Sequence, residues 1–163
     1  MKYFLLLLCC LVCIATMITA QNNYHEMTLP GLMQKKQQGD NNILIVDVRT
    51  KGEYHDTLSK GKQSNIGRIK DAMNIELREF QQNPEAVIKQ LEPYKDKEIY
   101  LICSHSYRSR SASNILLKNG FTNISNVQGG MTEWFRRYDE LAPYRSQFYE
   151  TKNSYSNISY LFS

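Results

Sequence analysis

The stretch that decides the fold reads Glu98-Ile-Tyr-Leu-Ile-Cys103-Ser-His-Ser-Tyr-Arg108-Ser109, and an amphipathic segment follows it. The apolar run predicts a buried strand that ends at Cys103, and the segment after the polar loop predicts a helix. Open α/β sheets keep their ligand sites at the carboxyl ends of the strands. Loop N–H groups and the positive end of the helix dipole there favour a thiolate over a thiol. The stretch therefore predicts a reactive cysteine.

Strands and helices alternate along the rest of the chain. The branched apolar run from Ile43 to Val48 is typical of a strand that is covered on both faces in a parallel sheet. We expect further strands at 72–75, 99–103 and 121–127, and helices over 28–39, 84–92, 131–138 and from the cysteine loop to Asn119. A lead-in at 21–26 and a surface loop at 56–65 complete the pattern. This order predicts an α/β fold of three layers, with helices flanking a mainly parallel central sheet.

The N-terminus has the pattern of a secretory signal peptide over residues 1–20. Lys2 precedes an apolar run from Phe4 to Ile18, and Ala20 is a small residue suited to cleavage. An uncleaved membrane anchor is the main alternative, because the run is only slightly shorter than the roughly 20 residues of a spanning helix. We therefore expect an exported protein, periplasmic or secreted. Its domain is predicted over residues 21–142, with a C-terminal extension of unknown role over 143–163.

Removal of the signal peptide changes the cysteine count. Cys9, Cys10 and Cys13 lie within the predicted signal, so Cys103 is the only cysteine of the predicted mature chain. An exported chain with a single cysteine has no internal disulfide, which points to a free thiol. The alternative is a buried cysteine that packs as a small apolar residue.

Composition narrows the possible partners. The chain of 163 residues carries a formal net charge of +4, with charges of both signs intermixed and without a long basic run. This distribution does not indicate a nucleic-acid-binding protein. His25, His55 and His105 lack the spacing of metal ligands, so we expect neither a metal nor a cofactor.

Four separated segments match, in order, the motifs of one family. They are Ile45-Val-Asp-Val-Arg49 with Glu53-Tyr54, Gly67-Arg-Ile-Lys-Asp-Ala-Met-Asn-Ile75, Cys103-Ser-His-Ser-Tyr-Arg108-Ser109 and Asn126-Val-Gln-Gly-Gly-Met-Thr-Glu-Trp134. By these segments the chain resembles rhodanese-like domains, whose motifs read DVR…EY, GHIxGAxNI, CxxGxRS and NLxGGxxxW. The resemblance covers nearly the whole predicted mature domain.

The resemblance implies a sulfurtransferase in which Cys103 carries a sulfane sulfur as a persulfide. The sulfur comes from a small anionic donor such as thiosulfate and passes to cyanide, a thiol or a protein acceptor. The implied active-site loop contains Ser104, His105, Ser106, Tyr107, Arg108 and Ser109. Arg108 either supports the anionic donor and the thiolate or ties down the loop through a carboxylate or carbonyls. Ser109 either caps the helix or hydrogen-bonds the sulfur, and His105, Ser106 and Tyr107 form the rim.

Three residues outside the loop are expected to support the site. Asp47 and Arg49 follow the first strand toward the same edge of the sheet, and we expect Arg49 to pair with Glu53 as a structural clamp. Arg68 replaces the histidine of the second family motif, and we expect it to face the pocket. Ser106 stands where many family loops have glycine, so a positive φ there would store backbone strain.

Two other functions remain open. In the similar loop of phosphatases of the same fold, five residues separate the cysteine from the arginine. Only four residues separate Cys103 from Arg108, and this tighter loop suits a single sulfur atom better than a phosphate. The other alternative is a non-enzymatic or redox module of the cell envelope that relays sulfur or binds a partner. We expect the protein to be a monomer and, once the signal peptide is cleaved, not to contact the membrane.

Overall fold

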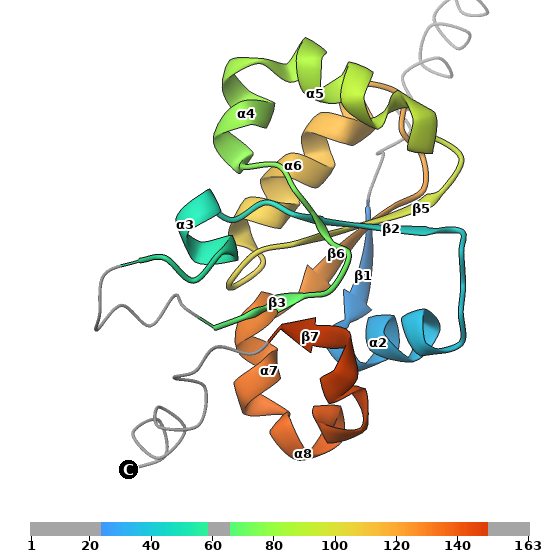
Figure 1. Cartoon of the computed structure of the whole chain (residues 1–163). Coiled ribbons are helices and arrows are strands. Elements are labelled where there is room, and N and C mark those ends of the chain that lie inside the picture. The colour runs from blue at the N-terminus through green and yellow to red at the C-terminus, as the bar shows by residue number, and fades with distance from the viewer. Residues whose placement is uncertain (1–23, 59–65, 150–163) are drawn as a thin grey trace, which may run out of the picture.

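The protein is an α/β domain of three layers with a parallel sheet at its centre (Figure 1). We describe the computed structural model over residues 24–58 and 66–149. The main sheet has five strands in the order β1-β6-β5-β2-β4, and every neighbouring pair is parallel. The strands are β1 (His25–Thr28), β2 (Ile43–Asp47), β4 (Met73–Asn74), β5 (Glu98–Ile102) and β6 (Ile124–Gln128). The predicted fold class is confirmed.

Helices cover both faces of this sheet, as seen in Figure 1. One face carries α4 (Leu77–Gln82), α5 (Pro84–Leu91) and α6 (Tyr107–Lys118). The other carries α2 (Leu29–Gln37), α7 (Glu133–Arg136) and α8 (Tyr138–Leu141). Short 3-10 helices connect them: η1 (Glu92–Tyr94), η2 (Gly130–Thr132) and η3 (Ala142–Gln147). Thr28 caps the start of α2, since its Oγ1 accepts a hydrogen bond from the Gly31 N–H at 3.2 Å.

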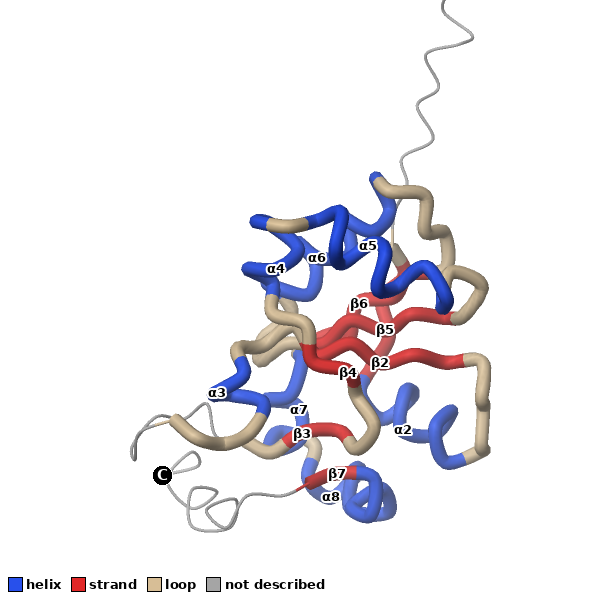
Figure 2. The backbone as a smooth tube through the Cα atoms, turned by 45° about the horizontal axis from the view of Figure 1, so that its top comes forward, coloured by secondary structure: helices blue, strands red, loops and turns tan. Residues whose placement is uncertain are grey.

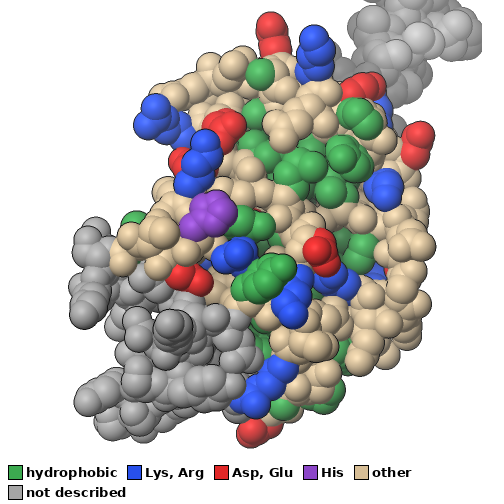
Figure 3. Space-filling view, viewed as in Figure 1, with side chains coloured by type: hydrophobic (Ala, Val, Ile, Leu, Met, Phe, Trp, Pro, Cys, Tyr) green, Lys and Arg blue, Asp and Glu red, His purple; other side chains and the backbone are tan. Residues whose placement is uncertain are grey.

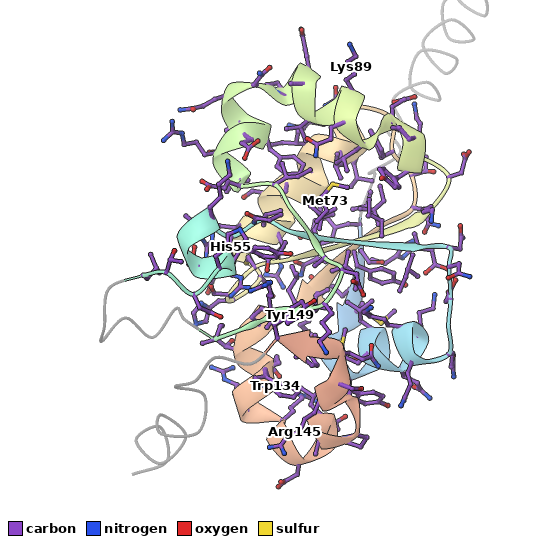
Figure 4. The ribbon with its side chains drawn as sticks, in the orientation of Figure 1. His55, Met73, Lys89, Trp134, Arg145 and Tyr149 are labelled. Carbon is purple, nitrogen blue, oxygen red and sulfur yellow. The ribbon has the colours of Figure 1, made fainter. Side chains whose placement is uncertain are left out.

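Alternate residues of the central strands enter two separate apolar cores. Ile45, Tyr100 and Ile102 pack on the α2 side, whereas Val46, Leu101 and Cys103 pack on the α4–α6 side. Figure 4 shows Met73 on the second side of the sheet and Trp134 on the first. The strands are buried on both faces, as the continuous apolar runs predict. Cys103 therefore faces the layer that contains α6.

A second, two-stranded sheet lies beside the main one (Figure 2). It pairs β3 (Arg68–Ile69) with β7 (Phe148–Tyr149) in antiparallel register. Phe148 stacks on Trp134 with 4.1 Å between ring centroids, and both are buried in the same core. Residues 143–149, which the sequence assigns to an extension, thus pack against the domain, while the boundary at residue 142 stays a prediction.

The structure also differs from the expected elements in detail. The helix α4 is not predicted, because Glu76 precedes it without a side-chain cap and only Phe80 of its residues is buried. The edge strand β1, which pairs with β6, begins within the predicted lead-in at 21–26 and extends beyond it to Thr28. The predicted 131–138 helix is divided among η2, α7 and α8. The predicted signal peptide with Cys9, Cys10 and Cys13, the loop at 59–65 and the tail from 150 lie outside the described residues. Among the described helices, none is long and apolar enough to span a membrane.

Candidate active site

The predicted cysteine loop connects the end of β5 to the start of α6, beside α3 (Lys51–Tyr54) (Figure 1). Cys103 is a free thiol with 1% of its surface exposed. The sulfur-bearing residue thus stands at the carboxyl end of a central parallel strand, where this class of sheet places its ligand sites. The strand-to-helix position predicted from the sequence is confirmed.

Ser106 adopts the left-handed conformation that the family pattern assigns to glycine. Its φ is 75° and its ψ is −19°, and it occupies the N-cap position of α6. A residue with a Cβ is strained there. In compensation, the buried Ser106 hydroxyl donates a hydrogen bond to the Val127 carbonyl at 3.1 Å. Serine therefore occupies a position of positive φ, and its hydroxyl adds a hydrogen bond to β6.

The turn at Gly130 supports the loop from beneath. The Met131 N–H donates to the Cys103 carbonyl at 2.8 Å, and both the N–H and the hydroxyl of Thr132 donate to the Ser104 carbonyl. A Cβ at Gly130 would lie 2.2 Å from the Cys103 carbonyl oxygen, and the φ of Gly130 is +64°. Only glycine permits this approach, which fixes the backbone on both sides of the Cys103–Ser104 peptide.

Arg108 forms a paired salt bridge with Glu53 on the α3 side of the loop. Its Nη1 lies 2.6 Å from Glu53 Oε2 and its Nη2 lies 2.7 Å from Oε1, while Nη2 also donates to Ser104 Oγ at 3.0 Å. These bonds raise the pKa of Arg108 above its ordinary value, although burial opposes the rise. Of the two roles left open for Arg108, the structure shows the tie to a carboxylate.

The expected clamp between Arg49 and Glu53 is wrong. Arg49 instead donates from Nε and Nη2 to the Asp47 carboxylate, with Nη2 at 2.7 Å from Oδ2, and from Nη2 to the Gly67 carbonyl. Residues two apart on an extended strand lie on the same side, so the guanidinium folds back onto Asp47. Glu53 is turned toward the loop by the capping box at the start of α3, in which it accepts from Thr50.

Asp47 and Arg49 are both fully buried, so each balances the charge of the other in the core. Arg49 ties the end of β2 to the turn at Gly67, and the Asn74 amide donates to the carbonyls of Asp47 and Arg49. These contacts hold the two strand ends together beside the loop. The Asp47–Arg49 pair thus stabilises the carboxyl end of β2.

Ser109 lies in the first turn of α6, close to the sulfur. Its Oγ is 3.5 Å from Cys103 Sγ, 3.0 Å from the Ser106 carbonyl and 2.6 Å from Asn126 Oδ1. Both roles considered for Ser109, a contact with the helix start and one with the sulfur, are therefore geometrically available. The bond to Asn126 is a third contact that the sequence does not predict.

The remaining predicted residues lie at the edge of the site or away from it. Tyr107 is 77% exposed and His105 is also exposed, in agreement with a rim position, whereas the rim position expected for Ser106 is wrong because its side chain is buried against β6. Arg68 lies between the rings of Tyr54 and Tyr149, at 5.0 and 4.5 Å from their centroids. Figure 3 shows basic and hydrophobic side chains side by side on the face over β3 and β7. Arg68 thus joins α3 to the C-terminal strand.

Several partners of the loop are not predicted from the sequence. Glu53 is expected to pair with the wrong arginine, and Asn126, a residue of the fourth motif, is given no role. The spacing Thr50-x-x-Glu53 signals a capping box, but not which arginine the carboxylate then meets. Among the described residues, no group of three or more His, Cys, Asp or Glu side chains is suited to hold a metal ion.

Comparison with protein families matches residues 32–137 to the Rhodanese-like domain. This match covers more than half of the chain and contains the cysteine loop. The chain belongs to the rhodanese-like domain family.

Several curated relatives of this rhodanese-like chain are tRNA uridine(34) hydroxylases. A tRNA uridine(34) hydroxylase of Photorhabdus laumondii is 32% identical over 108 residues, which make up 66% of this chain and 28% of that protein. The hydroxylase of Acinetobacter baumannii is 28% identical over 56% of this chain and 26% of its own length. The chain spans about a quarter of the length of these relatives.

Solved structures agree with the rhodanese fold. A rhodanese-related protein from Thermoplasma volcanium superposes with a TM-score of 0.52 at 24% identity, covering 70% of this chain and 93% of that one. A yeast protein described as a tyrosine phosphatase of the rhodanese family gives a TM-score of 0.55 at 21% identity, covering 71% and 87%. At these identities the likeness establishes the fold alone.

Substitutions at Ser106 should separate backbone strain from the hydrogen bond. We expect Ser106→Gly to remain within about 1 kcal/mol of wild type, because relief of the strained φ offsets the lost bond to Val127. Ser106→Ala keeps the strain and loses the bond, so it should be about 1 kcal/mol less stable than wild type. Urea denaturation measures both free energies of unfolding. Equal stability of the alanine variant and wild type would show that the bond contributes nothing.

The pH dependence of stability should report the Glu53–Arg108 pair. Burial by itself would raise the pKa of Glu53, but the hydrogen bonds from Arg108 and Thr50 outweigh it and lower the pKa from 4.5 to about 2. The pair therefore contributes stability above pH 4.5, and this contribution is lost as the pH falls toward 2. Urea denaturation of wild type and Glu53→Gln should differ near neutral pH, and the difference should shrink across that window.

Glu133→Gln serves as the control for this experiment. Glu133 pairs with Arg136 and Arg137, whose side chains are 69% and 45% exposed, so its loss should change stability by less than about 1 kcal/mol. A difference between Glu53→Gln and wild type that stays constant down to the acid limit would contradict the assigned role of the pair.

Proposed function

We propose that the chain is an exported sulfurtransferase that carries a sulfane sulfur on Cys103. The donor is a small anionic sulfur compound such as thiosulfate, and the acceptor is cyanide, a thiol or a protein thiol. The observation that carries the proposal is the placement of the buried, free Cys103 at the end of β5, in a loop that begins a twelve-residue helix. Membership of the rhodanese-like family supports it.

The proposed reaction has two steps that share Cys103. In the first, the Cys103 thiolate attacks the outer sulfur of thiosulfate, the S–S bond of the donor breaks, and sulfite leaves with the electron pair. In the second, the acceptor attacks the outer sulfur of the persulfide, and the Cys103 thiolate leaves. The two steps form a ping-pong cycle without net oxidation of the protein. The helix dipole of α6 favours the anionic sulfur in both states.

Two features of the loop favour sulfur over phosphate as the transferred group. Only Ser104 to Tyr107 separate the cysteine from Arg108, which makes a tight loop. Arg108 also directs Nη1 and Nη2 to the Glu53 carboxylate, so these donors are already occupied. A phosphatase of this fold would need that guanidinium for the phosphate oxygens. We therefore keep sulfur transfer ahead of phosphatase activity, despite the phosphatase descriptions of two structural neighbours.

Hydroxylation of tRNA is not part of the proposal. The relatives of that name extend far beyond the matched region, which makes up 28% of the Photorhabdus protein.

A non-enzymatic role in sulfur relay or redox exchange with an envelope partner is the remaining alternative, since it uses the same free thiol. We propose export to the periplasm or medium on the signal-like residues 1–20, and a monomer as the working form.

Incubation of the purified protein with thiosulfate, followed by intact-mass measurement, tests the proposal. We expect the mass of one sulfur atom to be gained on Cys103 and lost again when cyanide or a dithiol is added. Thiocyanate formation in the cyanide reaction measures turnover. A folded protein that never gains this mass from thiosulfate or from a small-molecule persulfide would overturn the proposal.

A further inference from the structure

A chain of hydrogen-bonded polar side chains leads from the sulfur of Cys103 to the edge strand β1. Ser109 Oγ lies 3.5 Å from Cys103 Sγ and 2.6 Å from Asn126 Oδ1 on β6. The Asn126 Nδ2 donates to Glu26 Oε2 on β1 at 2.7 Å, and Glu26 Oε1 pairs with Arg110 of α6 at 3.1 Å. Ser109 and Asn126 are fully buried, whereas Glu26 and Arg110 are partly exposed. The chain thus links the reactive sulfur to the surface.

The chemistry of the partners fixes the direction of these bonds. A carboxylate only accepts, so Glu26 orients the Asn126 amide with its NH₂ outward and its carbonyl oxygen toward Ser109. The Asn126 oxygen therefore requires the single hydroxyl hydrogen of Ser109, and their separation of 2.6 Å is the shortest that Ser109 makes. The Ser106 carbonyl at 3.0 Å is a second acceptor for the same hydrogen. The sulfur of Cys103 consequently faces a lone pair of Ser109.

We propose that Asn126, held by Glu26, is a positioning residue that directs the Ser109 hydroxyl away from Cys103 and so restrains formation of the thiolate. A thiol can donate to the Ser109 oxygen, but a thiolate needs a donor and gains none until the hydroxyl turns. The inference rests on the proposed sulfur transfer for its biological meaning. It goes further by assigning control of the resting nucleophile to two residues outside the active-site loop.

Charged groups on the other elements near Cys103 must stay constant in the test. Arg108 on α6 interacts electrostatically with Cys103, with Glu53 on α3 and with Asp47 at the end of β2. Glu26 on β1 and Arg110 on α6 lie at the outer end of the chain. Replacement of Asn126 changes none of these charges, so it separates hydrogen-bond direction from charge.

The first test compares Asn126→Ala, Ser109→Ala and the double variant by the rate of Cys103 alkylation with iodoacetamide as a function of pH. We expect Asn126→Ala to move the alkylation profile to lower pH by about one unit, since the freed hydroxyl can make a charge-assisted bond to the thiolate. The double variant should lose this shift, because it lacks the donor. A shift that persists without Ser109, or no shift in folded Asn126→Ala, would overturn the proposal.

Variants of the partly exposed Glu26 keep the test valid if Asn126→Ala fails to fold. Glu26→Ala removes the acceptor that orients the amide, so it should move the profile to lower pH, whereas Glu26→Gln retains an acceptor and should move it less. Ser113→Ala, at a buried serine one turn further along α6, is the control that should leave the profile unchanged. Equal profiles for Glu26→Ala and Glu26→Gln would also overturn the proposal.

Alkylation does not require sulfur transfer, so the outcomes of the two proposals are distinguishable. If the alkylation profile shifts as expected while thiosulfate and persulfides add no sulfur, the positioning role stands and the sulfurtransferase proposal fails. If sulfur is transferred but the profile does not shift, sulfur transfer stands and Asn126 has only a packing role.

Discussion

Replacement of Cys103 by serine should abolish sulfur uptake. The serine hydroxyl cannot form a persulfide, and we expect thiocyanate formation to fall by at least about a thousandfold. The intact mass of the variant should remain unchanged after incubation with thiosulfate. Because Cys103 is buried beside Leu101 and Ala112, its replacement also tests the packing, and circular dichroism must show that the variant is folded.

Two further variants complete this experiment. Cys103→Ala keeps an apolar side chain at the buried site and should lose sulfur uptake equally, so that the loss cannot come from the burial of a hydroxyl. Ser113→Ala, on the helix that follows the loop, should retain full uptake. Sulfur transfer by a folded Cys103→Ser protein would refute the assignment of the site.

Replacement of Gly130 by alanine should have the largest effect on stability. The new Cβ would lie 2.2 Å from the Cys103 carbonyl oxygen and 2.6 Å from the Ser104 carbonyl oxygen, both of them backbone atoms of the loop. Since backbone cannot turn aside as a flexible side chain does, the loop or the turn must move. We expect a loss of more than about 3 kcal/mol, measured by urea denaturation.

Gly120→Ala is the matched control, because it shares the positive φ without the close contact. The φ of Gly120 is +82°, and among the described residues no atom lies within 4 Å of the place that an added Cβ would take. Only the cost of the left-handed backbone therefore remains, about 1–2 kcal/mol. The excess loss in Gly130→Ala then measures the approach of the turn to the loop. Equal losses in the two variants would show that the contact beneath Cys103 contributes nothing.

The local pattern of apolar and polar residues was sufficient to predict the main strands and helices. The strand at Ile43–Asp47 and the strand before Cys103 follow from continuous apolar runs, which need cover on both faces. The loop and the following helix lie where the sequence predicts them, because polar residues separate the apolar run of the strand from the helical pattern that follows. Helix α4 is not predicted from the sequence, because it is short and is stabilised by packing against α6 rather than by a side-chain cap of its own.

By itself, the sequence determined the family, the parallel α/β fold and the position of Cys103 between strand and helix. Only the tertiary structure decided which charges and polar groups meet around it. Glu53 lies 55 positions from Arg108, and Asn126 lies 100 positions from Glu26, so neither pair leaves a local pattern in the sequence. The physical reason is that periodicity reports which face of an element is buried, whereas a hydrogen-bond partner is fixed by how separate elements pack.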